Sequence, residues 1–317
     1  MRKEKPQDYR HAAGGAMRKP RTPTPGHVLP RDATCLSVIA FLNRKGGVGK
    51  TSCCHHLGGC FGASGRRVLL VDADPQASLT QGLIGPAATE ALAAEETLAG
   101  LFDDAFDPDP ARMIRATGIP GVSLLPSSAQ LDAHNRPGPS SAGELQNALR
   151  TLVDEARAAF DVILIDCPPN LYLCSWAALV AADFVVVPFQ PEDYGSQGIT
   201  AICTAIAQVQ ARRNPGLRLL GYLLTMVQRR LGLHAAYDRQ LRALYGADVF
   251  ETVVPRAKDF AESVSARLPI TSWKPRSTGA RAISALAVEL EWRVSGFVHG
   301  GPGAGVQPEA ARAPGAR

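Results

Sequence analysis

The amino-acid sequence predicts an α/β fold of three layers, in which a mostly parallel twisted sheet is flanked by helices. Three observations lead to this prediction. Short apolar runs with β-branched residues alternate along the chain with helix-length amphipathic stretches. Several of these runs are apolar throughout, as strands buried on both faces of a parallel sheet are. Strands that alternate with helices form βαβ units, whose right-handed crossovers return each strand to the same sheet.

The individual elements follow from the same patterns. We expect strands at residues 36–42, 67–72, 122–125, 162–165, 184–187 and 219–224. We expect helices at residues 50–63, 144–159, 198–211, 235–244 and 280–294. In such a sheet, ligands bind beyond the carboxyl ends of the strands, so the residues that follow the strands are the first candidates for function.

The chain of 317 residues is expected to hold one folded domain, residues 35–296, between two disordered segments. The first segment, 1–34, is basic and rich in Pro and Gly, and the second, 297–317, is rich in Gly, Pro and Ala. Neither has enough large apolar side chains to offset the entropy lost on ordering. Met17 is an alternative start of the chain.

The positive charge is concentrated in the first segment. Residues 1–31 contain eight Lys or Arg and two Asp or Glu and so carry +6, which leaves −1 for the rest of a chain whose net charge is +5. The folded body is therefore not basic as a whole, and a DNA contact by the body would need a local patch. The basic arm is either a solvated tail or a source of sequence-independent attraction to phosphates.

No apolar run has the length of a signal sequence or a membrane span, so we expect a cytoplasmic protein. Seven cysteines at irregular spacing are not a disulfide framework and are expected to be reduced thiols. Cys53, His56 and Cys60 share one face of the expected helix 50–63, which leaves two interpretations: a metal site or ordinary packing, with packing favoured because no fourth ligand is evident.

A glycine-rich loop follows the first expected strand and opens the first expected helix. It consists of Lys45, Gly46, Gly47, Val48, Gly49, Lys50, Thr51 and Ser52. Glycines let backbone N–H groups converge on phosphate oxygens at a helix N-terminus, where the helix dipole also attracts anions. Lys50 would reach the β and γ phosphates of a nucleotide, and the Thr51 hydroxyl would bind Mg²⁺. Arg44 stands where the strict P-loop pattern has its first glycine.

Carboxylates end two other expected strands. Asp72 and Asp74 close the strand 67–72 within the sequence Asp-Ala-Asp-Pro-Gln, and Asp166 closes the strand 162–165 before Cys-Pro-Pro. Parallel strands bring these ends to one edge of the sheet, beside the glycine loop. Asp166 is placed to hold Mg²⁺, and the prolines after it favour a loop that senses the γ-phosphate.

These motifs resemble those of the ParA/MinD family of ATPases. KGGVGK resembles the family's deviant Walker A motif, DADPQ its DxDPQ box and IDCPP its Walker B region, and the resemblance covers residues 36–295. It implies a P-loop NTPase fold in which Lys45 reaches across a dimer to the phosphates of the other subunit. It also implies that Asp74 positions the attacking water and that Asp72 supports Mg²⁺ through water or hydrogen bonds. Only about 35 residues precede the first strand, which favours the short type without a helix-turn-helix domain.

The resemblance extends to the base and to DNA. Met226 and Pro255 would lie at the adenine, although Ala257 replaces an asparagine that the family often has two residues after that proline. The family binds DNA without sequence preference through basic residues, which implies phosphate contacts alone. The candidates here are Arg256, Lys258, Arg267, Lys274, Arg276 and Arg281. A solvated arginine-rich face is the alternative.

The resemblance thus implies an ATP- and Mg²⁺-dependent switch that dimerises with ATP, binds the nucleoid and hydrolyses ATP slowly until a ParB-like partner stimulates it. Chromosome or plasmid partition is the expected role. The same ATPase mechanism could instead position a chemoreceptor array, a secretion machine or the division machinery. A MinD-like membrane positioner would need an apolar C-terminal helix face, and an iron–sulfur protein of the same fold would need interface cysteines, for which only Cys167 and Cys174 lie near the switch.

Overall fold

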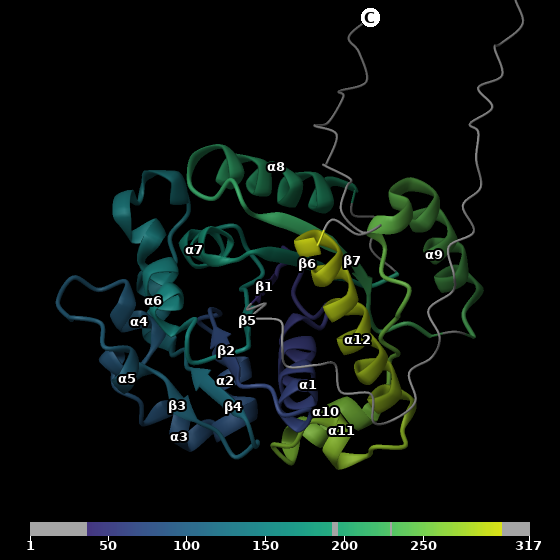
Figure 1. Ribbon diagram of the computed structural model, residues 1–317, viewed down its shortest axis with the longest axis horizontal. Coiled ribbons are helices and arrows are strands. Elements are labelled where there is room, and N and C mark those ends of the chain that lie inside the picture. Colours follow the sequence, from purple (N-terminus) through teal and green to yellow (C-terminus); the bar gives the residue numbers. More distant parts are fainter. Residues whose placement is uncertain (1–36, 192–195, 229, 300–317) are drawn as a thin grey trace, which may run out of the picture.

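The computed structural model describes residues 37–191, 196–228 and 230–299, so both expected terminal segments lie almost wholly outside the described residues. Within these ranges the chain forms one sheet with the strand order β3-β4-β2-β5-β1-β6-β7 (Figure 1). The strands are β1 Ser37–Phe41, β2 Val68–Asp72, β3 Arg115–Ala116, β4 Val122–Leu125, β5 Val162–Asp166, β6 Phe184–Phe189 and β7 Arg218–Leu224. All pairs are parallel except β3–β4 at the edge, which confirms the predicted sheet.

Helices cover both faces of this sheet. They are α1 Lys50–Ala63, α2 Ser78–Ile84, α3 Pro86–Glu90, α4 Leu98–Leu101, α5 Pro110–Met113, α6 Ala148–Ala156, α7 Leu173–Ala181, α8 Ser196–Arg212, α9 Gly232–Tyr245, α10 Lys258–Ser265, α11 Ile270–Trp273 and α12 Thr278–His299. Figure 1 shows α6, α7 and α8 on one side of the sheet and α1 with α12 on the other. Among the described helices, none combines the length and the apolar composition that a membrane crossing requires.

The two cores follow from the alternation of side chains along the central strands. In β1, Val38 and Ala40 belong to the core under α6, α7 and α8, whereas Ile39 and Phe41 belong to the core under α1 and α12. Because successive side chains of a strand point to opposite faces, a continuously apolar strand supplies both cores at once. The three-layer prediction is therefore confirmed.

The structure differs from the prediction at several helices. The expected helix 144–159 begins as a 3₁₀ turn, Gly143–Asn147, in which the Gln146 amide bonds the Gly143 carbonyl and accepts a hydrogen bond from the Trp176 indole. The helix α7 was not predicted at all. All nine of its residues are buried, so its sequence shows no amphipathic period. α12 continues to His299, beyond the expected end at residue 294.

Two buried histidines attach α1 to the segment that joins α10 to α11. Nε2 of His55 donates to the carbonyl of Leu268 at 3.4 Å, and Nδ1 of His56 accepts from the N–H of Ile270 at 3.2 Å. Both rings are almost fully buried, and burial lowers the pKa of His55 to about 4 and that of His56 well below its ordinary value. The two side chains are therefore structural, rather than the surface residues of an ordinary amphipathic helix.

This burial predicts acid sensitivity. Because the folded state holds His55 neutral, its stabilisation is present above pH 6.5, the unfolded pKa, and is lost as pH falls from there toward 4. At pH 5 the loss from His55 alone should be about 2 kcal/mol. Urea unfolding at pH 7 and pH 5 measures it. His55→Gln should reduce the difference between the two pH values, whereas His134→Gln, at a partly exposed loop position, should not.

Candidate functional site

The glycine loop joins β1 to α1 at the carboxyl edge of the sheet. Gly47 and Gly49 have φ values of 74° and 86°, in the left-handed region that other residues avoid. Gly49 is the N-cap of α1 and carries no side-chain cap, so the first N–H groups of this 14-residue helix remain available to an anion. This is the local geometry that a phosphate cradle requires.

Contacts with two other strands, β6 and β7, and with the residues that follow them hold the loop in place. Asn43 donates to the carbonyl of Pro188, and Thr225 donates to the carbonyl of Val48 at 2.8 Å. The amide of Gln190 donates to the carbonyl of Gly47 at 2.8 Å. The sequence segments after β6 and β7 therefore support the cradle from outside, a role that their spacing along the chain does not reveal.

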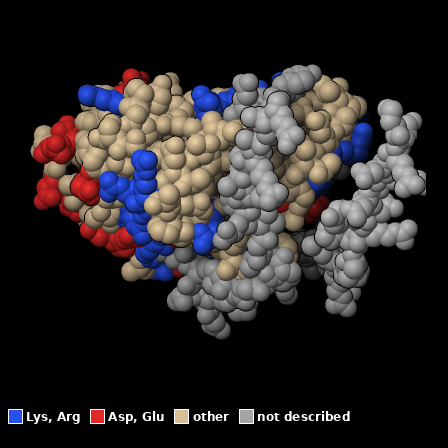
Figure 2. Space-filling model, turned by 90° about the horizontal axis from the view of Figure 1, so that it is seen from above, with Lys and Arg blue, Asp and Glu red and all other residues tan. Residues whose placement is uncertain are grey.

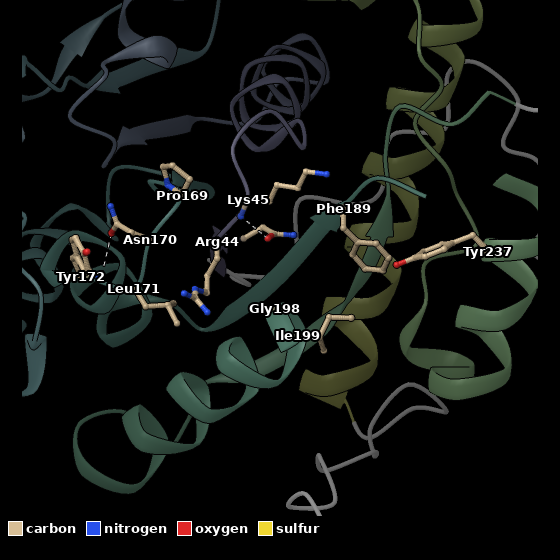
Figure 3. Close-up of a pocket in the computed structure, with 11 residues that line it drawn as sticks. Arg44, Lys45, Pro169, Asn170, Leu171, Tyr172, Phe189, Gly198, Ile199 and Tyr237 are labelled. Atoms are coloured by element: carbon tan, nitrogen blue, oxygen red, sulfur yellow. Dashed lines mark hydrogen bonds between the residues drawn. The ribbon is translucent and has the colours of Figure 1, made fainter. Parts of the chain in front are cut away.

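The three basic residues of the loop lie in different surroundings. Lys50 is only 6% exposed, and its Nζ donates to the carbonyl of Lys45 at 3.2 Å, inside the loop. Lys45 and Arg44 are exposed. Figure 3 shows the Arg44 side chain pointing toward Leu171 and α8, whereas the Lys45 side chain extends in the opposite direction. Lys50 thus belongs to the cradle of its own chain, and Lys45 lies at the surface.

A cleft of about 590 Å³ opens beside the start of the loop (Figure 3). Its polar lining comes from Asn43, Arg44, Lys45 and Asn170. Its apolar lining comes from Pro169, Leu171, Tyr172, Phe189, Ile199 and Tyr237, next to Gly198. Pro169 ends the Asp166-Cys-Pro-Pro segment and residues 170–172 follow it, so the cleft joins the loop start to the expected switch.

Asp166 is a buried carboxylate at the end of β5, beside the Thr51 hydroxyl. It is fully buried, and neither of its oxygens has a hydrogen-bond partner among the described residues. Burial, followed by the Asp72 carboxylate, raises its pKa, while the neighbouring Thr51 hydroxyl and Lys50 ammonium favour its charged form. Unpaired carboxylate oxygens beside a hydroxyl suit a hydrated Mg²⁺ ion, which keeps several of its waters. Thr51 and Asp166 therefore fit the predicted metal site.

Asp72 lies directly opposite Asp166 in the register of β2 and β5 and is equally buried. Its oxygens are occupied, however, because they accept hydrogen bonds from Thr80 and from the N–H of Asp74. Burial raises the pKa of Asp72 to about 7. The structure thus gives Asp72 partners other than a metal ion.

Asp74 is half-buried in the loop between β2 and α2. Its Oδ1 accepts from the N–H of Gln76 at 3.0 Å, and its carbonyl accepts from the N–H of Ala77. Ala77 has a φ of 52°, one of three positive φ values found at non-glycine residues in the described chain. The carboxylate therefore sits on a constrained turn at the same sheet edge as the cradle.

The two expected adenine residues come together although 29 positions separate them. An isolated bridge pairs Val227 with Pro255, which places Met226 and Pro255 side by side at the end of β7. Met226 has a φ of 53°, and its sulfur contacts the Gln190 amide that also holds Gly47. Strained backbone of this kind clusters at ligand sites. The N–H of Arg256 bonds the Val227 carbonyl, so an exposed cation borders the same corner.

The six expected DNA residues lie in differing environments. Arg256, Arg276 and Arg281 are exposed. Lys274 forms ion pairs with Asp259 at 2.7 Å and Glu262 at 2.6 Å, and Lys258 approaches Glu262 at 3.5 Å. Arg267 is exposed with a φ of 55°, and its guanidinium lies against Gly85. Residues 256–281 hold six cations and two carboxylates, a net charge of +4.

Acidic side chains gather elsewhere. Figure 2 shows them concentrated at one end of the molecule, on the side of α4 and α5. The metal alternative for Cys53, His56 and Cys60 finds no support, because no cluster of three His, Cys, Asp or Glu that could hold a metal ion occurs in the described part of the chain. Cys53 is buried against the core instead, as the packing interpretation predicts.

Sequence reasoning missed Thr80, Asn43 and the histidine contacts to residues 268–270. Only proximity in space identifies them, since their partners lie on other elements. Arg230, an exposed residue three positions after Val227, is a further cation that the expected DNA set omitted.

The fold and this site define the class of protein, a P-loop nucleotide-binding protein with a second lysine at the loop start. Residues 36–219 match the family model of an AAA domain. The chain is 35% identical to the sporulation initiation inhibitor protein Soj of Bacillus subtilis, over 80% of this chain and 97% of that protein. It is 38% identical to the chromosome-partitioning ATPase Soj of Thermus thermophilus, over 81% of this chain and 96% of that protein.

A similar solved structure is cobyrinic acid a,c-diamide synthase from Mycobacterium smegmatis with bound ADP and magnesium. It has a TM-score of 0.66 and 29% identity, and the match covers 84% of this chain and 96% of that one. The chain belongs to the ParA/MinD family of P-loop ATPases, among the relatives of the Soj type.

Proposed function

We propose that this protein is an ATP-dependent dimerising switch of the ParA type that acts in chromosome or plasmid partition. It binds ATP with Mg²⁺, dimerises, binds DNA without sequence preference and hydrolyses ATP slowly to ADP and phosphate. A ParB-like partner stimulates hydrolysis and releases the DNA. The Soj relatives support the partition role, and the relative solved with ADP and magnesium supports the nucleotide and the ion.

The observation that carries this proposal is the different placement of the two loop lysines. Lys50 is buried in its own cradle, whereas Lys45 is exposed and directed away from the Arg44 side of the loop. A switch requires ATP to bind the dimer better than the monomer, and such a difference needs a contact that exists only in the dimer. An exposed lysine beside the phosphate cradle is suited to supply that contact to a second subunit.

Phosphoryl transfer needs groups that position the reactants and groups that neutralise charge, and different site residues supply the two. Lys45, Lys50 and the N–H groups from Gly46 to Ser52 hold the phosphates. Thr51 and Asp166 hold Mg²⁺, which neutralises phosphate charge when bound. Asp74 orients the attacking water, and Met226 and Pro255 contact the adenine. Because Ala257 lacks a side-chain amide, we expect backbone groups to complete base recognition.

Lys45→Ala should abolish the ATP-dependent dimer while ATP binding by the monomer persists. The truncation removes the contact to the second subunit but leaves Lys50 and the cradle intact. Light scattering coupled to size exclusion, with ATP and then with ADP, measures the dimer. Arg112→Ala removes a similar charge from α5, where the side chain is exposed, and should dimerise normally. An ATP dimer of unchanged stability in Lys45→Ala would contradict the proposal.

Non-specific DNA binding is proposed for the positive segment 256–281. Its charge of +4 contrasts with −1 for the chain after residue 31, so it is a local patch on a nearly neutral body. Arg256 and Arg276 are its best candidates, because both are exposed and neither takes part in the ion pairs of Lys258 and Lys274.

Arg276→Ala should weaken DNA binding in the ATP state by a similar factor for all sequences. It should also lower the slope of log affinity against log salt by about one, since one phosphate contact is lost. Fluorescence anisotropy with two unrelated duplexes, over a range of salt, measures both quantities. DNA binding that needs no ATP would contradict the proposed control of binding by ATP. If Arg276→Ala leaves the slope unchanged, as the control Arg112→Ala should, the DNA surface lies elsewhere.

The same ATPase cycle could position a different cargo, such as a chemoreceptor array or a secretion or division machine. A neighbouring gene for a ParB-like protein, together with partition-type DNA sites, would favour DNA as the cargo. We propose a cytoplasmic, nucleoid-associated location. A MinD-like membrane role would instead be revealed if the protein sedimented with lipid vesicles in the presence of ATP.

A further inference from the structure

We propose that Asp72 is a positioning residue for the hydrolytic loop, which it holds through Thr80. The inference rests on the proposed ATPase function and deepens it, because it assigns Asp72 to the loop that carries Asp74 rather than to the metal ion.

Asp72 closes the loop between β2 and α2 at both ends. It is the last residue of β2 and is fully buried. Its Oδ1 accepts from the N–H of Asp74 at 3.2 Å, at the start of the loop. Its Oδ2 accepts from the N–H of Thr80 at 2.8 Å and from the Thr80 hydroxyl at 2.7 Å, in the first turn of α2. One carboxylate therefore fixes both ends of residues 73–79.

The hydrogen bonds from Asp74 and Thr80 to the Asp72 carboxylate are called the clamp below. The Thr80 hydroxyl connects this clamp to a second strand. It donates its single proton to Asp72 and accepts from the N–H of Ser127 at 3.0 Å, just after β4. Thr80 is fully buried and cannot contact water, so these two bonds satisfy its hydroxyl. The start of α2 is thereby tied to the ends of β2 and β4 together.

The loop needs such a clamp because its backbone is strained. Ala77 lies in the left-handed region with a φ of 52°, which costs roughly 1–2 kcal/mol for a residue with a Cβ. Strain of this size persists only where the surroundings impose it. Asp74 bonds Gln76 and Ala77 within the same turn, so its carboxylate keeps its direction only while the loop is held.

Asp72 and Asp166 differ in their hydrogen bonding. They are register partners on β5 and β2 and both are buried, but Asp166 has no hydrogen-bond partner among the described residues while Asp72 accepts three hydrogen bonds. Asp166 can therefore receive a cation without losing a contact. Asp72 already uses both of its oxygens to hold the loop, so a cation would compete with those bonds.

Thr80→Val, which replaces the hydroxyl by a methyl of similar size, tests this assignment. Turnover at saturating ATP and Mg²⁺ should fall roughly ten-fold or more, since a misplaced group can cost 10²-fold. The Mg²⁺ concentration for half-maximal binding of a fluorescent ATP analogue should stay within about two-fold of the wild type, because the metal donors are untouched. Thr80→Ser keeps the hydroxyl and should retain most of the turnover.

Amide hydrogen exchange gives a readout that needs no hydrolysis. Residues 73–80 should exchange faster in Thr80→Val than in the wild type, and Thr80→Ser should resemble the wild type. If Thr80→Val does not fold, Asp72→Asn takes its place, with the same expected pattern of faster exchange, lower turnover and unchanged Mg²⁺ requirement.

Two results would overturn the assignment. One is that Asp72→Asn needs a several-fold higher Mg²⁺ concentration and recovers its turnover in excess Mg²⁺. Asp72 would then help to bind the metal ion. The other is wild-type exchange and turnover in Thr80→Val. A wild-type protein that does not hydrolyse ATP would refute the proposed function instead, and the exchange data would still decide whether the clamp exists.

Discussion

Replacing Lys50 by alanine is expected to abolish ATP binding. Lys50 is almost completely buried, and its ammonium group lies inside the loop, within 3.2 Å of a loop carbonyl. It is positioned to donate to phosphate oxygens in a setting largely removed from water. A hydrogen bond to a charged partner contributes about 1.5–3 kcal/mol, and Lys50 is expected to make one to each of the β and γ phosphates. Its loss should therefore weaken ATP binding by at least roughly 100-fold.

Titration with a fluorescent ATP analogue in Mg²⁺ measures the effect of Lys50→Ala. Arg44→Ala is the matched control, since it removes a neighbouring positive charge whose side chain points away from Lys45, toward α8 (Figure 3). The control should bind the analogue within about two-fold of the wild type, whereas the loss of Lys50 should remove binding. Thermal unfolding of both variants checks that the fold is intact. ATP binding that survives Lys50→Ala would remove the basis of the whole site assignment.

Replacing Asp74 by alanine is expected to leave an ATP-bound dimer that turns over at least roughly 100-fold more slowly, within the range for loss of one positioned acid–base group. Asp74 is half-buried on a strained turn and is not one of the residues of the glycine loop. Its loss should therefore affect the chemical step rather than nucleotide affinity. In the proposed cycle hydrolysis dissolves the dimer, so the ATP dimer should accumulate in this variant.

Phosphate release and light scattering on the same sample separate these two effects for Asp74→Ala. Asp104→Ala, an exposed carboxylate in the loop between α4 and α5, is the control and should match the wild type in both. If Asp74→Ala hydrolyses ATP at the wild-type rate, the water-positioning role belongs to another residue. If the dimer fails to form, Asp74 contributes to binding instead.

The sequence predicts the sheet well because its signals are local. The strand Val68–Asp72, with four apolar residues before its terminal carboxylate, and the glycine loop before α1 carry their structure in their own sequence pattern. The elements that it missed lack such a pattern. The helix α7 is buried on all sides, and the two-residue strand β3 is too short to show any period.

The site residues also fall into two groups, those that a local sequence pattern identifies and those that only the tertiary structure identifies. The cradle from Lys45 to Ser52, Asp74 and Asp166 can be recognised from residue type and from position after a strand. The proximity of Met226 to Pro255 depends on a bridge between Val227 and Pro255, and the support of the loop by Asn43, Gln190 and Thr225 depends on how β1, β6 and β7 pair.

The sequence by itself determined that a nucleotide cradle lies at the carboxyl edge of a parallel sheet, because that result needs only strand, loop and helix in order. The tertiary structure alone decided which carboxylate is free and which is bound. Asp72 and Asp166 both end apolar strands, yet the packing of α2 brings Thr80 to Asp72, whereas Asp166 has no hydrogen-bond partner within the described part of the chain. Hydrogen bonding depends on atoms within about 3 Å of one another, and residues that meet at that distance can lie anywhere along the chain.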